Sequence, residues 1–381
     1  MSKKIGILSV YNHNYGSILQ AYALQNVLEE MGNTTEIIVY KKTNYVKQAM
    51  RLLYVPLLKA ALKMKWKNVY CRLFQKNTYN SVLQRREIAF SKFISENMHF
   101  SQVYSGRSAL IQSCKNYDCF VLGSDQVWNP MNLGGDFYTM TFIPDFQKKI
   151  TYAPSFGISN IPEGQREKTA AYLKRIDKIS VREQDGKRIV SEFTGRNAQI
   201  VVDPTILIDR KIWDQKKSKR IIAENYIFCY FISGNLSYRE FAKRLAAKTG
   251  LKIICIPHVD EFVKADENYA EFGEIGIGPL EFVNLVSNAS FVCTDSFHGS
   301  VFSTLYQKTF FTFSRYSKEG KYSTNSRLYS FLSMTGLESR MFQANQDVTE
   351  KDLENPDFSV AVQRLQEQRT ASFVYLKEAL E

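Results

Sequence analysis

The sequence predicts an α/β protein made of two units. Strand and helix patterns alternate from residue 5 to about residue 202, and a second alternation starts at Tyr226. The 381 residues are too many for one ordinary hydrophobic core and suit two domains. A hydrophobic fraction of 44% indicates a folded globular chain. We therefore expect two consecutive α/β domains.

The chain opens with a strand, a helix and a second strand. Apolar patterns place these elements at residues 5–10, 18–31 and 35–40. Parallel sheets present ligand sites at the carboxyl ends of their strands, so the polar turn at residues 11–17 should face a crevice. His13, Asn14 and Ser17 are the candidate binding residues of this turn. The alternative is that His13 and Asn14 only form the turn.

Polar residues also follow later strands of this unit. Strands are expected at residues 118–122, 149–153, 179–183 and 199–202, with helices at residues 81–96 and 163–175. Ser124, Asp125 and Gln126 come directly after the first of these strands, and Arg182 stands at the end of the third. Several polar strand ends at one sheet edge indicate a site better than any one of them alone.

The second unit repeats the alternation. Its strands are expected at residues 226–232, 251–256, 291–293 and 309–313, and its helices at residues 238–248 and 279–288. We interpret residues 206–213 as the linker, and we expect a helix at residues 358–380 that packs back on the first unit. The expected domains are residues 1–206 and 207–345, followed by a helical tail over residues 346–381.

The turn between residues 294 and 300 is the strongest candidate for an anion site. A short apolar strand leads into it and an apolar helix follows, so its backbone amides belong to a first helical turn and lack partners within the helix. Ser296, His298 and Ser300 add donors, and Gly299 lets a ligand approach the backbone. The alternative is that Ser296 caps the helix and His298 is an ordinary turn residue.

The net charge of +12 is concentrated in one segment, residues 41–86. No acidic residue lies between Glu36 and Glu87, whereas twelve basic residues do, and apolar and aromatic residues are interleaved with them. This mix suits a helix on an anionic membrane surface, where each basic residue contributes about 1 kcal/mol. The alternative is a solvated insertion with a helix packed on the core. We expect no nucleic-acid partner, because no nucleic-acid-binding motif accompanies the charge.

Composition also sets expectations for the compartment and for metals. The sequence starts with a strand pattern instead of a signal peptide and contains no stretch near the roughly 20 apolar residues of a membrane span, so we expect a cytoplasmic protein, peripheral at the inner face of the membrane at most. Its six cysteines are scattered without C-x-x-C spacing, which favours buried thiols over disulfides or a metal site. No carboxylate pair has metal-ligand spacing, and we expect no obligatory metal.

Five blocks of the sequence together resemble the signature blocks of the polysaccharide pyruvyl transferase family. They occur in the family's order, at residues 14–25, 123–129, 180–183, 203–205 and 294–300. The resemblance implies a GT-B-like pair of Rossmann-type domains with the site in the cleft between them. It also implies transfer of the enolpyruvyl carbons of phosphoenolpyruvate to a sugar as a cyclic ketal, with phosphoenolpyruvate as co-substrate and no cofactor.

The resemblance also implies roles for individual residues. His298 and Arg182 would act on the donor, with His298 either the general acid or a phosphate ligand. Other donor-binding candidates in the C-terminal domain are Ser296, Gly299, Ser300 and Arg315. The acceptor-binding candidates in the N-terminal domain are His13, Asn14, Ser17, Ser124, Asp125 and Gln126. Some members of the family have an arginine at the position of Ser296, so another residue, such as Arg315, would have to supply that charge here. Arg315 and Arg327 are weaker candidates for binding the phosphate.

Three functions from different classes remain open on the sequence. The first is a pyruvyl transferase of capsule or exopolysaccharide biosynthesis that acts on a surface glycan or on its undecaprenyl diphosphate-linked precursor. The second is a GT-B glycosyltransferase that uses a sugar nucleotide. The third is a non-catalytic assembly protein.

Overall fold

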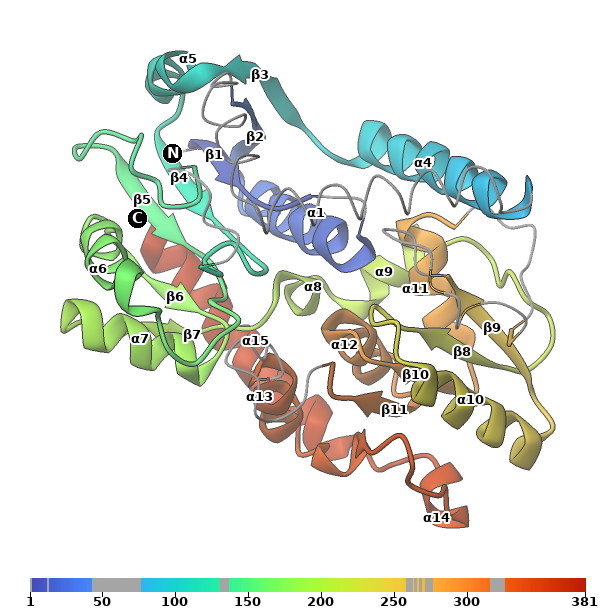
Figure 1. Cartoon of the computed structure of the whole chain (residues 1–381). Helices are drawn as coiled ribbons and strands as arrows, with labels where there is room; N and C mark the ends of the chain where they lie inside the picture. Colours follow the sequence, from blue (N-terminus) through green and yellow to red (C-terminus); the bar gives the residue numbers. More distant parts are fainter. Residues whose placement is uncertain are drawn as a thin grey trace.

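Two parallel five-stranded sheets form the framework of the computed structural model, which describes residues 2–11, 14–42, 77–130, 137–257, 263, 266, 269–270, 277–315 and 326–381. Helices lie against both sheets, and the two halves are joined in the middle of the molecule (Figure 1). The expected α/β fold with two Rossmann-like units is therefore confirmed.

The first sheet has the strand order β3-β2-β1-β4-β5. Its strands are β1 (Lys4–Leu8), β2 (Thr34–Lys41), β3 (Phe100–Ser105), β4 (Cys119–Leu122) and β5 (Lys148–Thr151). Helices α1 (Tyr15–Glu30), α4 (Asn77–Asn97) and α5 (Gly106–Ser113) connect them. The order reverses between β1 and β4, which is the point of such a sheet where a crevice opens for ligands. Sequence reasoning found every strand of this sheet except β3, whose pattern is largely polar.

A short two-stranded sheet continues the first half. It consists of β6 (Ser180–Val181) and β7 (Gln199–Ile200), accompanied by a 3₁₀ turn at Glu163–Gln165, α6 (Arg166–Lys174) and α7 (Gln184–Thr194). The amide of Thr151 donates to the carbonyl of Lys178 at 3.0 Å, which aligns this small sheet with β5. The carboxyl end of β6 therefore lies on the same side as those of β1 and β4.

The second sheet has the strand order β12-β11-β10-β8-β9. Its strands are β8 (Tyr226–Tyr230), β9 (Lys252–Ile256), β10 (Phe291–Thr294), β11 (Thr309–Phe313) and β12 (Met341–Phe342). The accompanying helices are α10 (Leu236–Thr249), α11 (Pro279–Asn288), α12 (Phe297–Leu305) and α13 (Ser326–Thr335). Here the order reverses between β8 and β10, so the turn after β10 stands at the second reversal point.

The predicted linker at residues 206–213 is packed into the hydrophobic core. It forms α8 (Pro204–Leu207) and α9 (Arg210–Lys216), and Trp213 is fully buried in it. The Trp213 ring contacts Tyr22 of α1 at 5.8 Å between centroids and Phe302 of α12 at 5.4 Å. Because these aromatic rings come from both halves, the connection is packed into one continuous hydrophobic core.

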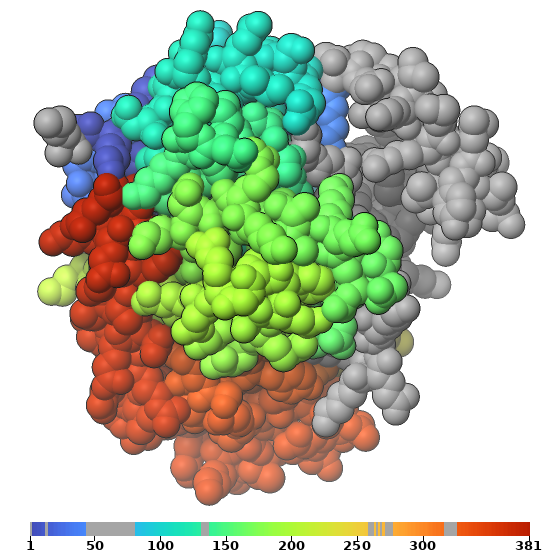
Figure 2. Space-filling view, turned by 90° about the vertical axis from the view of Figure 1, so that its left-hand side faces the viewer, coloured from blue at the N-terminus to red at the C-terminus, as the bar shows by residue number. Residues whose placement is uncertain are grey.

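The helix predicted over residues 358–380 is confirmed as α15 (Ser359–Leu380), which follows α14 (Glu350–Leu353). It returns to the first half, where the Tyr375 hydroxyl donates to the carbonyl of Thr151 at 2.8 Å and the Ser372 hydroxyl accepts from the amide of Val202 at 3.0 Å. Figure 2 shows this segment in red along the edge of the molecule, from the second half to the N-terminal region. The helix thus fastens the two halves together.

Several sequence expectations fall wholly or partly outside the described residues. The basic segment at residues 41–86 is described only at its two ends, so its association with a membrane stays a prediction. Among the helices that the structure describes, none is both long and apolar enough to cross a membrane. Cys114, Cys119, Cys229, Cys255 and Cys293 are buried free thiols, as expected, whereas Cys71 lies outside the described residues.

Candidate functional site

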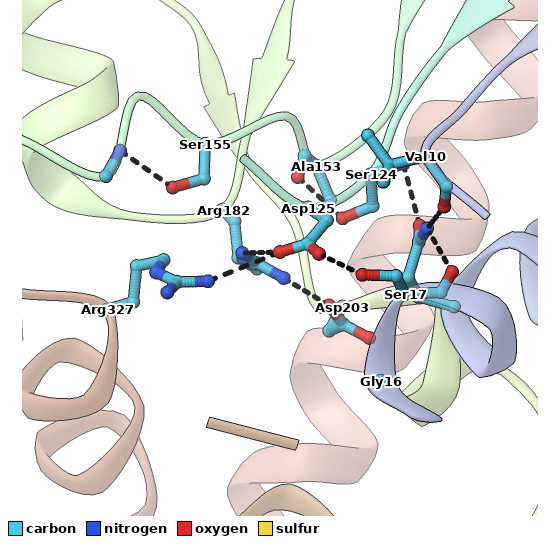
Figure 3. A network of polar contacts seen from close by, with 12 residues as sticks. Val10, Gly16, Ser17, Ser124, Asp125, Ala153, Ser155, Arg182, Asp203 and Arg327 are labelled. Carbon is cyan, nitrogen blue, oxygen red and sulfur yellow. Dashed lines mark hydrogen bonds and ion pairs between the residues drawn. The ribbon is translucent and has the colours of Figure 1, made fainter. Parts of the chain in front are cut away.

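The carboxylate of Asp125 is the centre of a polar network between the two halves. Asp125 follows β4 with a left-handed backbone (φ 62°), a conformation that Asp tolerates better than most residues. Its Oδ2 accepts a hydrogen bond from the Ser17 hydroxyl of α1 at 2.9 Å. Its Oδ1 contacts the guanidinium groups of Arg182 at 3.4 Å and of Arg327, in α13, at 3.3 Å (Figure 3). One carboxylate therefore joins three separate elements of the chain.

Arg182 and Arg327 form a buried cationic pair. Both side chains are at most 7% exposed, and both guanidinium groups lie over the ring of Phe297, at 4.5 Å and 5.7 Å from its centroid. Burial lowers the pKa of Arg182, but Asp203 and Asp125 raise it above its ordinary value. Burial and the charge of Arg182 lower the pKa of Arg327 to about 10. Both groups therefore carry a positive charge at neutral pH.

Asp203 links Arg182 to His298. It caps α8 by accepting from the amide of Thr205 at 3.0 Å, and its other oxygen accepts from Arg182. The same oxygen lies 3.5 Å from Nε2 of His298. Burial tends to raise the pKa of Asp203, but His298 and Arg182 hold it well below its usual range. Asp203 is therefore an ionised partner for both predicted donor-site residues.

His298 stands in the first turn of α12, pressed against the first turn of α1. A Cβ atom at Gly16 would lie 2.1 Å from Nδ1 of His298, which is far closer than two such atoms can approach. Only glycine at this position allows α1 and α12 to come so close. The imidazole is therefore enclosed by Gly16 on one side and by Asp203 on the other.

Two further donor-site candidates have structural partners. Ser296 caps α12 through a hydrogen bond from the amide of Gly299 at 3.3 Å, as the alternative interpretation proposed. Ser300 is fully buried and donates to Thr312 at 3.0 Å. A Cβ atom at Gly299 would lie 2.4 Å from Thr294 Oγ1, so this glycine is required by packing inside the half. These three residues therefore stabilise the turn through contacts within the second half.

Some acceptor-site candidates belong to the polar network, and others have structural partners elsewhere. Ser17 and Asp125 belong to the network, whereas the fully buried Ser124 donates to the carbonyl of Ala153 at 2.7 Å. Asn14 caps α1 by accepting from the amide of Gly16 at 3.0 Å, as the turn-forming alternative proposed. The Gln126 amide packs against Gly157. His13 lies outside the described residues.

Arg327 makes an ion pair with Asp125, and the predicted donor-site residue Arg315 lies near it. Arg315 follows β11 and is near enough for its charge to lower the pKa of Arg327, but Arg327 makes the contact with Asp125. Sequence reasoning gave no site role to Asp203 or Gly16. The Asp-Pro-Thr block at residues 203–205, with a capping residue before a proline at the first helical position, was the available signal for Asp203.

A cavity of about 230 Å³ adjoins the cationic pair. Its charged wall consists of Arg182, Glu183, Asp203 and Arg327, and its apolar wall comes from β7, α8, Phe297 and α13. The Nε atoms of both arginines are buried and have no hydrogen-bond partner among the described residues. Within the described part of the chain, no group of three His, Cys, Asp or Glu side chains could hold a metal ion.

The turn after β8 has its amides occupied by the protein itself. The carboxylate of the buried Asp295 accepts from the amides of Ile232 at 2.6 Å and of Ser233 at 2.9 Å. In nucleotide-binding sheets such a turn donates its amides to a phosphate group. Here the anion is already supplied by a side chain.

Comparison with known proteins gives one family. The sequence profile described as Polysaccharide pyruvyl transferase matches residues 14–317, which is more than half of the chain. No curated protein matches the sequence.

Solved structures resemble the fold at low sequence identity. A UDP-GlcNAc 2-epimerase from Neisseria meningitidis is 11% identical, with a TM-score of 0.46 and coverage of 98% of this chain and 100% of its own. A putative UDP-N-acetylglucosamine 2-epimerase from Listeria monocytogenes is 9% identical, with a TM-score of 0.48 and coverage of 99% and 97%. An E. coli heptosyltransferase is 11% identical, with a TM-score of 0.38 and coverage of 87% and 99%.

Replacing Gly16 tests the contact between α1 and α12. The added methyl group of Gly16→Ala must displace His298, and overpacking of this kind costs about 1–3 kcal/mol. We expect a lower free energy of unfolding in urea and a shifted imidazole resonance of His298 among the four histidines of the chain. Gly164→Ala is the control, because nothing lies within 4 Å of its Cβ position. An unshifted His298 resonance in Gly16→Ala would contradict the contact.

The pH dependence of stability tests the environment of Asp203. A carboxylate whose pKa is lowered by folding stabilises the folded state above its unfolded pKa of about 3.9, and this contribution is lost as the pH falls. Asp203→Asn should therefore cost about 3–5 kcal/mol at pH 7, because it removes the anion beside His298 and leaves the buried Arg182 with only its longer contact to Asp125. The difference from the wild type should shrink in urea titrations between pH 5 and pH 3. A difference that is constant over this range would show that Asp203 is not ionised in the folded protein.

Proposed function

Because the chain belongs to the polysaccharide pyruvyl transferase family, we propose that it transfers a pyruvyl group from phosphoenolpyruvate to a sugar, forming a cyclic ketal. The observation that supports this most strongly is the convergence of Arg182, Arg327 and His298 on one spot between the halves. The acceptor would be a sugar of a surface polysaccharide or of its undecaprenyl diphosphate-linked precursor.

The cationic pair suits the charge of the donor. Phosphoenolpyruvate carries a phosphate and a carboxylate, and guanidinium groups bind such planar or tetrahedral anions through paired donors. Arg182 and Arg327 are buried beside the cavity, and each has an Nε donor without a described partner. A bound anion would satisfy these donors and compete with Asp125 for the two guanidinium groups. Arg327 would thus supply the charge that Ser296 lacks.

His298 would bind the phosphate and assist its departure. Its Nε2 is buried, lies 3.5 Å from Asp203 and has no hydrogen-bond partner among the described residues, so a phosphate group that reached it would be its partner. The ionised Asp203 would stabilise the imidazolium and keep its orientation, as carboxylates do for catalytic histidines. The first turn of α12 adds its dipole to the same spot.

Ser17 and Asp125 would orient the acceptor from the N-terminal half. Burial raises the pKa of Asp125, but Arg182, His298 and Arg327 together lower it below its ordinary value, so the side chain stays ionised and can accept hydrogen bonds from sugar hydroxyl groups. Asp125 contacts the donor-side arginines as well. It would therefore hold the acceptor hydroxyls next to the donor.

The glycosyltransferase alternative gains no support from the turn after β8. Asp295 occupies the amides with which such a turn would bind the phosphates of a sugar nucleotide. The cellular setting that we propose, in the cytoplasm and at the inner face of the membrane, depends on the basic segment at residues 41–86.

Calorimetric titration with phosphoenolpyruvate tests the proposed function. We expect the wild type to bind it, and Arg182→Ala and Arg327→Gln each to weaken binding about 10- to 100-fold, because each removes a charge-assisted hydrogen bond. Arg364→Ala, an exposed arginine on α15, should leave the affinity unchanged. A wild type that binds UDP- or GDP-sugars and not phosphoenolpyruvate would overturn the proposal in favour of a glycosyltransferase.

A further inference from the structure

Glu183 is a buried carboxyl group beside the cationic pair that the proposed function leaves unused. It directly follows Arg182 and stands at the N-cap position of α7, but its side chain makes no capping hydrogen bond. The residue is 1% exposed and lines the 230 Å³ cavity together with Arg182, Arg327 and Phe297. A carboxyl group is costly to bury, so its position in this wall calls for a reason.

The two oxygens of this carboxyl group are in different situations. Ser155 Oγ lies 2.7 Å from Glu183 Oε1 and accepts a hydrogen bond from the amide of Gly157 at 3.0 Å. Since the amide uses the hydroxyl as an acceptor, the hydroxyl proton of Ser155 points to Oε1. Oε2 is buried and has no hydrogen-bond partner among the described residues. A proton carried by Glu183 therefore resides on Oε2, for which the described residues supply no hydrogen-bond partner.

The positive charges around Glu183 do not offset the effect of its burial on its pKa. Burial raises its pKa above the ordinary value, and this effect outweighs the opposing charges of Arg182 and Arg327. Those two guanidinium groups are also shared with Asp125 and Asp203. The pKa values of Glu183 and Asp125 are thus shifted in opposite directions although both groups adjoin the same arginines, which is the arrangement that separates an acid from an ionised group in other active sites.

Ketal formation requires protonation of the methylene carbon of phosphoenolpyruvate, and His298 is poorly placed to donate that proton. The methylene carbon of the donor must be protonated before its neighbour becomes electrophilic. The His298 ring is enclosed by Gly16 at Nδ1 and faces Asp203 at Nε2, and it is not part of the cavity wall. If Nε2 serves the phosphate, a second acid must serve the methylene carbon.

We propose that Glu183 is this catalytic acid; the proposal rests on the proposed pyruvyl transfer. The Oε2–H bond breaks as the C2=C3 electron pair of phosphoenolpyruvate takes the proton and forms a methyl group. One acceptor hydroxyl oxygen then bonds to C2, the C2–O bond to phosphate breaks, and the second hydroxyl oxygen closes the ketal. Of the two protons that the hydroxyls lose, one leaves with phosphate and the other restores Glu183.

Glu183→Gln separates proton donation from binding. The amide oxygen can still accept from Ser155 and the side chain keeps its shape, but it no longer donates an acidic proton. Without an acceptor sugar, water can take the acceptor's place and phosphoenolpyruvate is slowly converted to phosphate and pyruvate. In D₂O, the protonation of the methylene carbon then appears as deuterium in the methyl group of pyruvate. We expect Glu183→Gln to release phosphate at least about 100-fold more slowly than the wild type. Its affinity for phosphoenolpyruvate should stay within about threefold, and its stability in urea at pH 7 should be unchanged.

Two controls keep the proposal falsifiable. Glu338→Gln, at an exposed glutamate, should behave as the wild type. Infrared difference spectra of the unliganded proteins should show a protonated carboxyl band in the wild type that Glu183→Gln lacks. A variant that releases phosphate at the wild-type rate, or the absence of this band, would overturn the role of Glu183. A wild type that fails to bind phosphoenolpyruvate would instead refute the proposed function itself.

Discussion

At the candidate site, the arrangement of the two halves depends on the ion pairs of Asp125. Its carboxylate contacts Ser17 of α1, Arg182 after β6 and Arg327 of α13. Ser17 and Asp125 meet because the first sheet reverses its strand order between β1 and β4, and the arginines reach them from β6 and α13. A charge buried at this place would be costly without its partners, so the halves must meet in register for the network to form.

The network also holds the two arginines in positions where they could bind an anion. Asp125 and Asp203 hold Arg182 in place, and Phe297 supports both guanidinium groups. A donor anion would exchange with carboxylate contacts that already orient the arginines, which reduces the reorganisation needed on binding. Because Gly16 has no side chain, α1 can approach His298 closely. A donor bound at the cationic pair would thus contact residues from both halves.

The sequence predicted the fold and the main site residues to different depths. Alternating apolar runs were sufficient for the two sheets, and α11 was predicted to the residue, but β3 was missed because three of its six residues are polar and do not alternate with the apolar ones. The sequence pattern identified the candidates that follow a predicted strand: Ser17, Asp125, Arg182 and His298. Arg327 lies in a helix far along the chain, and whether it or Arg315 reaches Asp125 depends on tertiary packing. Tertiary packing also decides that Ser296 and Ser300 form hydrogen bonds within the second half, with Gly299 and Thr312.

A crystal structure of the protein with phosphoenolpyruvate tests the central claim most directly, namely that the donor is held by the cationic pair between the halves. The account predicts phosphate or carboxylate oxygens within about 2.7–3.2 Å of guanidinium nitrogens of both Arg182 and Arg327, with the phosphate near His298 Nε2. The methylene carbon should face Glu183. A donor bound elsewhere on the molecule, with both arginines still engaged only by Asp125 and Asp203, would contradict it.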